Sequence, residues 1–206
     1  DTLFPYTTLF RSGENTTIVD LGSTKQKIIE AVPESIRQNF IPAHPMAGTE
    51  YSGPTAAFSG LFKDAVVAIC DFKESGEMHV KRSVELFSHL GMKIIFMSAA
   101  EHDHHASVIS HLPHAISFSL ASSVLKKENK KNIIALSGTG FNGMIRIAKS
   151  SPVMWTDIFK QNKQNLINSI DLFKKELNEC ENLIKNEKWD ELREWMNEAR
   201  KIREIL

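Results

Sequence analysis

The residues best suited to chemistry lie in the segment 44–50, HPMAGTE, which directly follows the apolar run 40–43. This run is typical of a buried strand, so His44 falls where that strand ends. Open α/β sheets bind their ligands at the edge formed by the carboxyl ends of their strands. A histidine at that edge can exchange a proton near neutral pH and suits general acid–base catalysis. A solvated loop histidine would give the same local pattern, so the hypothesis depends on the other segments.

Two further polar clusters accompany this segment. Residues 20–23 (DLGS), with Lys25 close behind, follow the β-branched run 16–19 and so also fall at a strand end. The segment 101–114 is rich in histidine and is predicted to be helical. Residues three and four apart share a helix face. One face of this helix therefore carries His104, Ser107, His111 and His114.

The histidine cluster has two interpretations as a binding site. Histidines three and seven residues apart could bind zinc. The chain has no HExxH motif, however, and no cysteine lies near the cluster. We therefore favour an organic anion over a metal ion as its ligand.

A GxGxxG pattern occurs at residues 138–143, after the apolar run 133–136. A dinucleotide site of this type also needs a helix, a second strand and an acidic residue at the end of that strand. In this chain the glycines precede a short basic segment, Pro152 and a long helix. We interpret the glycines as a loop between helices and not as a cofactor site.

The short basic segment contains Arg146 and Lys149, one helical turn apart. Both side chains can therefore face one ligand. The arginine guanidinium binds a carboxylate through two parallel hydrogen bonds. A basic turn that caps a helix on the surface is the alternative.

The first half of the chain alternates strands and helices. The sequence predicts four strands, two clear helices and a weaker one, and this alternation favours a largely parallel α/β sheet. The strands are expected at 16–19, 40–43, 65–70 and 92–97, the clear helices at 24–32 and 78–90, and the weak helix at 56–63.

The second half is predicted to be entirely helical. We expect a helix over 101–127 that bends at Pro113, a short helix over 144–149, a long one from Pro152 and a last one over 189–206. Apolar residues recur along the long helix at steps of three and four, which is typical of a helix–helix interface. They could pack within one monomer or between two. This seam comprises Phe159, Leu166, Ile170, Phe173, Leu177, Cys180 and Ile184.

Composition narrows the class of protein. The 206 residues carry no net charge, so nothing indicates a nucleic-acid partner, and no apolar run suggests a membrane partner. Cys70 and Cys180 lie far apart without a CxxC motif, which fits a reducing cytoplasm. Residues 1–12 resemble a translated sequencing adapter, so we interpret them as an artefact and expect the natural chain to start near Gly13.

Taken in chain order, four motifs resemble the prephenate dehydrogenase family. They are DLGS at 20–23, HPMAGTE at 44–50, SHLPH at 110–114 and RIAKS at 146–150, the last followed by Met154 and Trp155. The resemblance implies the carboxyl half of a Rossmann-type NAD(P)-binding domain over 13–97. It implies a helical substrate-binding and dimerisation domain over 98–206, and hence a homodimer.

The family's reaction is the oxidative decarboxylation of prephenate to 4-hydroxyphenylpyruvate, with hydride passing to NAD or NADP. The resemblance implies that His44 is catalytic, that it hydrogen-bonds the ring hydroxyl of the substrate, and that Ser23 orients it. It further implies cofactor binding by Asp20, Gly22 and Ser23, and no metal. The substrate-binding residues that it implies are Ser110, His111, His114, Arg146, Trp155, Thr49 and Glu50.

One departure and three alternatives accompany the resemblance. Family members open with a strand and a GxGxxG motif that bind the pyrophosphate, and no such segment precedes Gly13. We therefore expect this chain by itself to be inactive and not to bind the dinucleotide productively. The alternatives are arogenate dehydrogenase, a non-catalytic helical dimerisation module and a zinc-binding protein.

Overall fold

The computed structural model of the protein describes residues 13–48 and 53–205. The proposed artefact at 1–12, together with Thr49 and Glu50, lies outside the described residues. The chain divides into two compact units, Asp1–Leu166 and Ile167–Leu206. The sheet and the helices that surround the predicted site belong to the first unit.

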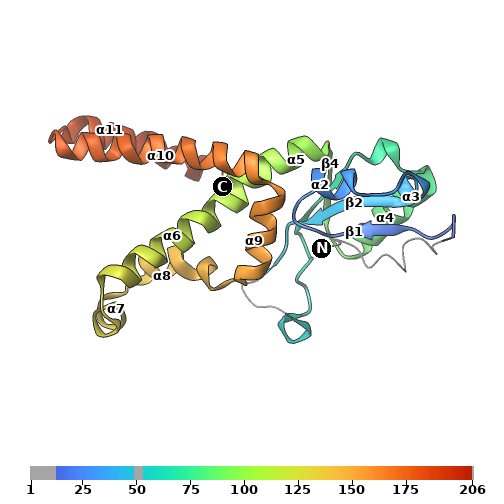
Figure 1. Ribbon diagram of the computed structural model, residues 1–206, viewed down its shortest axis with the longest axis horizontal. Coiled ribbons are helices and arrows are strands. Elements are labelled where there is room, and N and C mark those ends of the chain that lie inside the picture. Colours follow the sequence, from blue (N-terminus) through green and yellow to red (C-terminus); the bar gives the residue numbers. More distant parts are fainter. Residues whose placement is uncertain (1–12, 49–52, 206) are drawn as a thin grey trace. The chain divides into compact units, whose positions relative to one another are not determined.

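A four-stranded sheet is built in the order β1-β2-β3-β4 from the described residues (Figure 1). Its strands are β1 (Ile18–Asp20), β2 (Phe40–Pro45), β3 (Val66–Cys70) and β4 (Lys93–Met97). All four coincide with the predicted strands to within two residues.

The sequence led us to expect a largely parallel sheet, and the sheet is mixed, with one antiparallel pair among the described strands. β1 pairs with β2 and β3 with β4 in parallel, but β2 and β3 are antiparallel, with His44 opposite Ala68. A parallel pair needs a long crossover connection, usually a helix. The described part of the β2–β3 connection contains only the single turn η1 (Pro54–Ala56). The helix expected over 56–63 is absent, so β3 runs back along β2.

Short helices flank these strands. α2 (Gln26–Glu30) confirms the helix predicted over 24–32, two residues shorter at each end. α3 (Glu34–Arg37), which the sequence did not predict, begins directly after Pro33. η2 (Phe72–Glu74) follows β3. α4 (Glu77–His89) confirms the predicted amphipathic helix.

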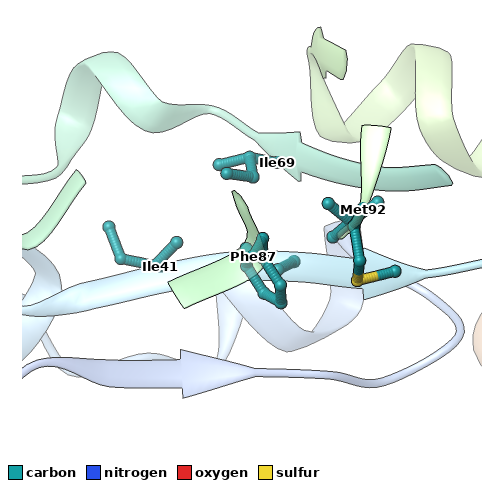
Figure 2. Close-up of a cluster of buried hydrophobic side chains, with 6 residues drawn as sticks. Ile41, Ile69, Phe87 and Met92 are labelled. Carbon is teal, nitrogen blue, oxygen red and sulfur yellow. The ribbon is translucent and has the colours of Figure 1, made fainter. Parts of the chain in front are cut away.

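The core beneath the sheet is formed by β2, β3 and α4. Figure 2 shows Ile41 and Ile69, from the two antiparallel strands, close to Phe87 of α4 and to Met92. The two isoleucines are fully buried, and Phe87 is 2% exposed. Burying each such side chain stabilises the fold by about 1.5–3 kcal/mol. This core fixes the position of β2, and therefore of His44 near its end.

The long helical stretch predicted after β4 is confirmed. It consists of α5 (Ala99–Ala106), the π-helical turn η3 (Ser107–His111) and α6 (Leu112–Lys127). Ser98 and Glu101 form a capping box at its start. Pro113 has no N–H to donate, and the hydrogen-bond pattern departs from the α-helix in the turn directly before it.

The remaining helices are α7 (Lys130–Leu136), α8 (Thr139–Ile145), η4 (Arg146–Lys149), α9 (Pro152–Gln161), α10 (Lys163–Lys185), α11 (Trp189–Ala199) and η5 (Arg200–Glu204). The GxGxxG pattern lies at the start of α8 and within it, and the apolar run before it belongs to α7. The loop expected between helices is therefore wrong, because the pattern is helical. The run before it is a helix and not the strand that a dinucleotide motif needs, and the interpretation against a cofactor site stays a prediction. The long helix expected from Pro152 is broken at Asn162, whose backbone has φ −109° and ψ 33°.

The second unit contains most of α10 and all of α11. The two helices run side by side (Figure 1), and the indole N–H of Trp195 donates to Glu176 over 3.2 Å. Glu187, between them, adopts a left-handed backbone with φ 54°. The predicted apolar seam is only partly covered, because Leu177 is 55% exposed and Ile184 48%.

The helical stretch Ala99–Lys127 is also long and apolar enough to cross a membrane, by length and composition alone. The sequence did not lead us to expect this. The same stretch carries His102, Asp103 and His111, which are buried in the first unit. We therefore treat it as a helix of that folded unit, which brings these three side chains towards the sheet.

Candidate functional site

His44 is the fifth residue of the six-residue strand β2. Its Nδ1 atom lies 2.8 Å from Nε2 of His102, on α5, and the two rings meet edge to face. Burial lowers the pKa of His44 to about 3, and the neighbouring His102 and Lys25 contribute to this lowering. His44 is therefore a neutral imidazole at pH 7.

His102 and Asp103 continue this contact into the protein. Nδ1 of His102 lies 2.8 Å from Oδ1 of Asp103. The Asp103 carboxylate also accepts the backbone N–H groups of Lys25 and Gln26, over 2.8 and 2.9 Å. Burial raises the pKa of Asp103, but the hydrogen bonds from His102 and the two backbone groups outweigh burial, so the pKa is lowered. Asp103 is thus a buried anion that holds the start of α2 against α5.

Beside this pair lies the ammonium group of Lys25, which is fully buried. It donates to the Asp20 carboxylate and, over 2.7 Å, to the carbonyl oxygen of Ala43. Burial lowers the pKa of Lys25, and the attraction of Asp20 opposes that effect. Through these two contacts the Lys25 ammonium joins the ends of β1 and β2, the two parallel strands whose carboxyl ends meet at this edge.

The turn after β1 is held by a hydrogen bond between two residues close together in the sequence. Asp20 Oδ1 accepts the backbone N–H of Gly22 over 2.9 Å. A Cβ atom on Gly22 would lie 2.8 Å from Cδ1 of Ile28, so a larger residue would not fit without movement. Among the described residues, no hydrogen bond joins Ser23 to His44. The structure gives His44 a different partner, His102.

A second group of rings surrounds His111, on η3. The Asn162 amide donates to the carbonyl oxygen of Asp103 over 2.6 Å and lies 3.2 Å from Nδ1 of His111. Because that amide nitrogen is a donor, Nδ1 of His111 accepts, and the ring proton sits on Nε2. Nε2 is buried, and within 13–48 and 53–205 it has no hydrogen-bond partner. Burial lowers the pKa of His111 to about 4.

Trp155, on α9, joins His111 to His114. The Trp155 ring stacks on His114 at 3.5 Å between centroids and meets His111 edge to face at 6.0 Å. Its indole Nε1 is buried, again without a partner among the described residues. Burial and the nearby Arg146 guanidinium lower the pKa of His114, while its hydrogen bond to the Ser110 carbonyl raises it. Arg146 and Trp155, predicted from one motif, thus both lie near His114, which was predicted from another.

The structure groups most of the predicted site residues. His44 is connected through His102, Asp103 and Asn162 to His111, and from there to the Trp155 group. His104 is the exception, because it is exposed while Ser107 and His111 are buried. The π-helical turn spans Ser107 to His111, so it changes the helix phase of His111 and of the residues after it, and not that of His104 relative to Ser107.

Sequence reasoning missed three of these residues as site residues. His102 and Asp103 lay in the histidine-rich segment, but only the helix face of His104 was selected from it. Asn162 carried no sequence signal, since it lies inside what looked like one continuous helix. Within the described ranges, no three His, Cys, Asp or Glu side chains form a cluster that could hold a metal ion.

Comparison with known proteins identifies the family. Residues 10–96 match the nucleotide-binding domain of prephenate dehydrogenase, and residues 98–198 match its dimerization domain. The crystal structure of Aquifex aeolicus prephenate dehydrogenase with hydroxyphenyl propionate and NAD+ is 33% identical, with a TM-score of 0.86, over 95% of this chain and 68% of that one. The chain belongs to the prephenate dehydrogenase family. The resemblance inferred from four motifs, and the α/β fold followed by an all-helical part, are both confirmed.

Other members of this family differ in their stated substrates. A cyclohexadienyl dehydrogenase of Zymomonas mobilis and a prephenate dehydrogenase of Bacillus subtilis are each 32% identical over 192 residues, or 92% of this chain. The matched region covers 66% and 52% of them, so the chain spans between about half and two thirds of their length. The Synechocystis arogenate dehydrogenase structure is 26% identical, with a TM-score of 0.75, over 91% of this chain and 68% of that one.

Proposed function

We propose that this protein carries out the NAD-dependent oxidative decarboxylation of prephenate to 4-hydroxyphenylpyruvate, a step of tyrosine biosynthesis. Assays of turnover use a chain restored ahead of Gly13 with a family-type pyrophosphate-binding segment, because we expect the 206 residues by themselves to be inactive. The observation that carries the proposal is the state of His44. It is a neutral imidazole at the end of β2, bonded through Nδ1 to His102. No described residue bonds its Nε2, which is therefore available to a substrate hydroxyl.

His44 acts on the hydroxyl of the substrate ring. Its Nε2 accepts a hydrogen bond from that group and draws the proton away as hydride leaves the same carbon. The bound nicotinamide supplies the acceptor for that hydride. Loss of carbon dioxide makes the ring aromatic, which drives the reaction.

The second group of rings binds the acidic part of the substrate. His111 Nε2–H and Trp155 Nε1–H are buried donors without acceptors among the described residues, and an unpaired buried donor costs about 1–3 kcal/mol. A substrate carboxylate or keto oxygen would satisfy them. Arg146, an exposed cation near His114, would pair with a carboxylate, and Ser110 and the undescribed Thr49 and Glu50 complete the set.

The cofactor edge is the turn that follows β1. The Asp20 side chain accepts the backbone N–H of Gly22, and this hydrogen bond fixes the shape of the turn. Leu21, between the two residues, is 56% exposed and forms the outer side of the turn. An apolar surface at the carboxyl edge of a sheet fits the face of a nicotinamide ring. NAD is the first choice, because the Aquifex aeolicus relative was crystallised with NAD+. NADP is the alternative.

We also propose that this protein forms a homodimer. The matched dimerization domain supports it, as does the amount of apolar surface on the helices. Ile109 and Leu125 on the Ala99–Lys127 stretch are 68% and 72% exposed, and Leu172 on α10 is 58% exposed. Exposed apolar surface of this extent is typical of an interface between subunits.

Calorimetric titration with prephenate and with arogenate, alongside an NADH-formation assay, tests the substrate. We expect prephenate to bind, and Arg146→Ala to weaken it about tenfold or more, because a lost carboxylate contact costs at least ~1.5 kcal/mol. Lys131→Ala, which removes an exposed cation from α7, is the control. If the protein prefers arogenate, the proposed function becomes that of an arogenate dehydrogenase. If neither ligand binds, the proposed function is wrong.

A further inference from the structure

His44, His102 and Asp103 form one continuous hydrogen-bonded chain. Its two links are each 2.8 Å long, and His102 and Asp103 are 3% and 1% exposed. Both oxygens of Asp103 also accept backbone N–H groups. The Asp103 carboxylate is therefore the hydrogen-bond acceptor in all of these contacts. Nδ1 of His102 must then carry the proton that it shares with Asp103.

The proton between the two imidazole rings has only two possible positions. If it sits on Nδ1 of His44, both rings are neutral and Nε2 of His44 is an unprotonated acceptor. If it sits on Nε2 of His102, that ring carries two protons and is a cation, and the neutral His44 then has its own proton on Nε2. The second state contains one proton more than the first.

We propose that His102 and Asp103 are positioning residues that hold His44 as the Nδ1–H tautomer and take up the positive charge when His44 accepts a proton. The substrate hydroxyl gives its proton to Nε2 of His44, and His44 gives the proton on Nδ1 to Nε2 of His102. The cation then lies on His102, against the Asp103 carboxylate. When carbon dioxide leaves, the ring oxygen takes its proton back from Nε2, and the proton between the rings returns to His44.

The surroundings of His44 explain why the charge should move. The titratable and charged groups that act on it are His102, Asp103, Lys25 and His111. A cation on His44 would be largely desolvated and close to the Lys25 ammonium, so burial and repulsion both oppose it. On His102 the same charge lies in direct contact with an anion. A histidine that is a poor base by itself becomes a usable one through its neighbour.

The tautomer can be tested on this chain without any turnover. Nitrogen-15 NMR of the histidine rings distinguishes protonated from unprotonated nitrogens. At neutral pH we expect His44 with a protonated Nδ1 and an unprotonated Nε2. The exposed His105, on the same helix as His102, serves as the reference for a solvated ring. A wild-type His44 protonated on Nε2 at neutral pH would overturn the proposal.

Acid titration tests the charge transfer by the same signals. The first proton taken up by the pair should appear as a switch of His44 to the Nε2–H form while His102 becomes doubly protonated. Double protonation of His44 with His102 unchanged would overturn the transfer. His102→Gln keeps an amide oxygen for His44 and an N–H for Asp103, so the tautomer should persist. His102→Phe removes both, and His44 should revert to a mixture of tautomers.

The kinetic test rests on the proposed function and uses a chain restored ahead of Gly13, wild type and variants alike, because we expect the 206 residues by themselves to be inactive. With prephenate and NAD, His102→Gln should lower kcat by about tenfold or more with KM within about twofold, because it cannot accept the proton. His105→Gln is the matched control and should leave both constants unchanged. Unchanged kcat in His102→Gln would overturn the transfer. Absence of turnover in the wild type would count against the proposed function alone, because the NMR results decide the tautomer and the transfer independently.

Discussion

The side-chain amide of Asn162 donates a hydrogen bond to the backbone carbonyl of Asp103 over 2.6 Å. Asn162 is also the residue at which α9 ends, and it is 4% exposed. The break in the helix therefore turns a buried amide towards the residue that holds His102. One contact joins the helix that carries Trp155 to the chain of hydrogen bonds that ends at His44.

Replacing Asn162 by alanine should lower the free energy of unfolding by about 1–3 kcal/mol, because the carbonyl of Asp103 loses a buried partner. Asn132→Ala is the matched control. Asn132 is exposed, so its replacement should change the stability by no more than about 0.5 kcal/mol. Urea denaturation measures both. Equal effects of the two substitutions would show that the Asn162 contact contributes nothing specific.

In a chain restored at its amino terminus, His44→Asn should reduce turnover of prephenate by roughly 10²–10⁴-fold, the usual effect of losing a general acid–base group. Binding of hydroxyphenyl propionate should change far less, since the rings around Trp155 are untouched. Steady-state kinetics and calorimetry separate the two effects. If turnover survives while binding is lost, His44 is a binding residue, and the proton acceptor lies elsewhere.

Acidification should destabilise the protein, with His44 and His111 as contributors. Burial lowers their folded pKa values to about 3 and about 4, below the ordinary value of 6.5. Between those values and pH 6.5 the unfolded chain binds protons that the folded chain does not, so the free energy of unfolding falls as the pH is lowered. Above pH 6.5 the two histidines are largely neutral in both the folded and the unfolded chain, so their contribution to the free energy of unfolding no longer changes with pH.

Thermal unfolding between pH 7 and pH 4.5 measures this slope. His111→Gln should make it shallower, whereas His105→Gln, at an exposed site, should not. A slope that is identical in all three proteins would show that the burial of His111 does not govern the acid response.

Gly143→Ala should stabilise the protein by roughly 0.5–1 kcal/mol, since glycine inside a helix costs about that much relative to alanine. Gly143 lies within α8, and an added Cβ atom would meet nothing within 4 Å. The same holds for Gly140. Calorimetry should detect no productive binding of NAD to this chain, before or after both changes. Micromolar NAD binding that is lost on replacing these glycines would mean that the GxGxxG pattern contacts the cofactor after all.

Leu177→Asp should disrupt a homodimer, because it places a charge in exposed apolar surface on α10. Lys175→Glu, on the same helix and exposed, changes the charge without touching an apolar residue and is the control. Light scattering at micromolar concentration reports the mass. A wild-type monomer, or a dimer unaffected by Leu177→Asp, would remove this part of α10 from the interface.

Local pattern was enough to locate most elements and several site residues. β-branched runs predict β1 and β3, because such side chains fit a half-buried pleated surface, and all four strands lie where the sequence predicts them. The same reasoning places His44 near the end of β2. The GxGxxG pattern could be set aside for a local reason as well, since no second strand follows it. These features depend on neighbours within a few residues, which the sequence displays directly.

The direction of β3 and the partners of His44 were decided only by the tertiary structure. β3 is antiparallel to β2 because the described part of the chain between them has no crossover helix, a property of the connection and not of either strand. His44 meets His102 across 58 positions, and Asn162 reaches Asp103 across 59. A hydrogen bond depends on where two backbones are brought together by packing, and no periodicity within one segment encodes that position. The exposure of His104 beside the buried Ser107 and His111 was likewise decided by packing, because helical spacing alone placed all three on one face.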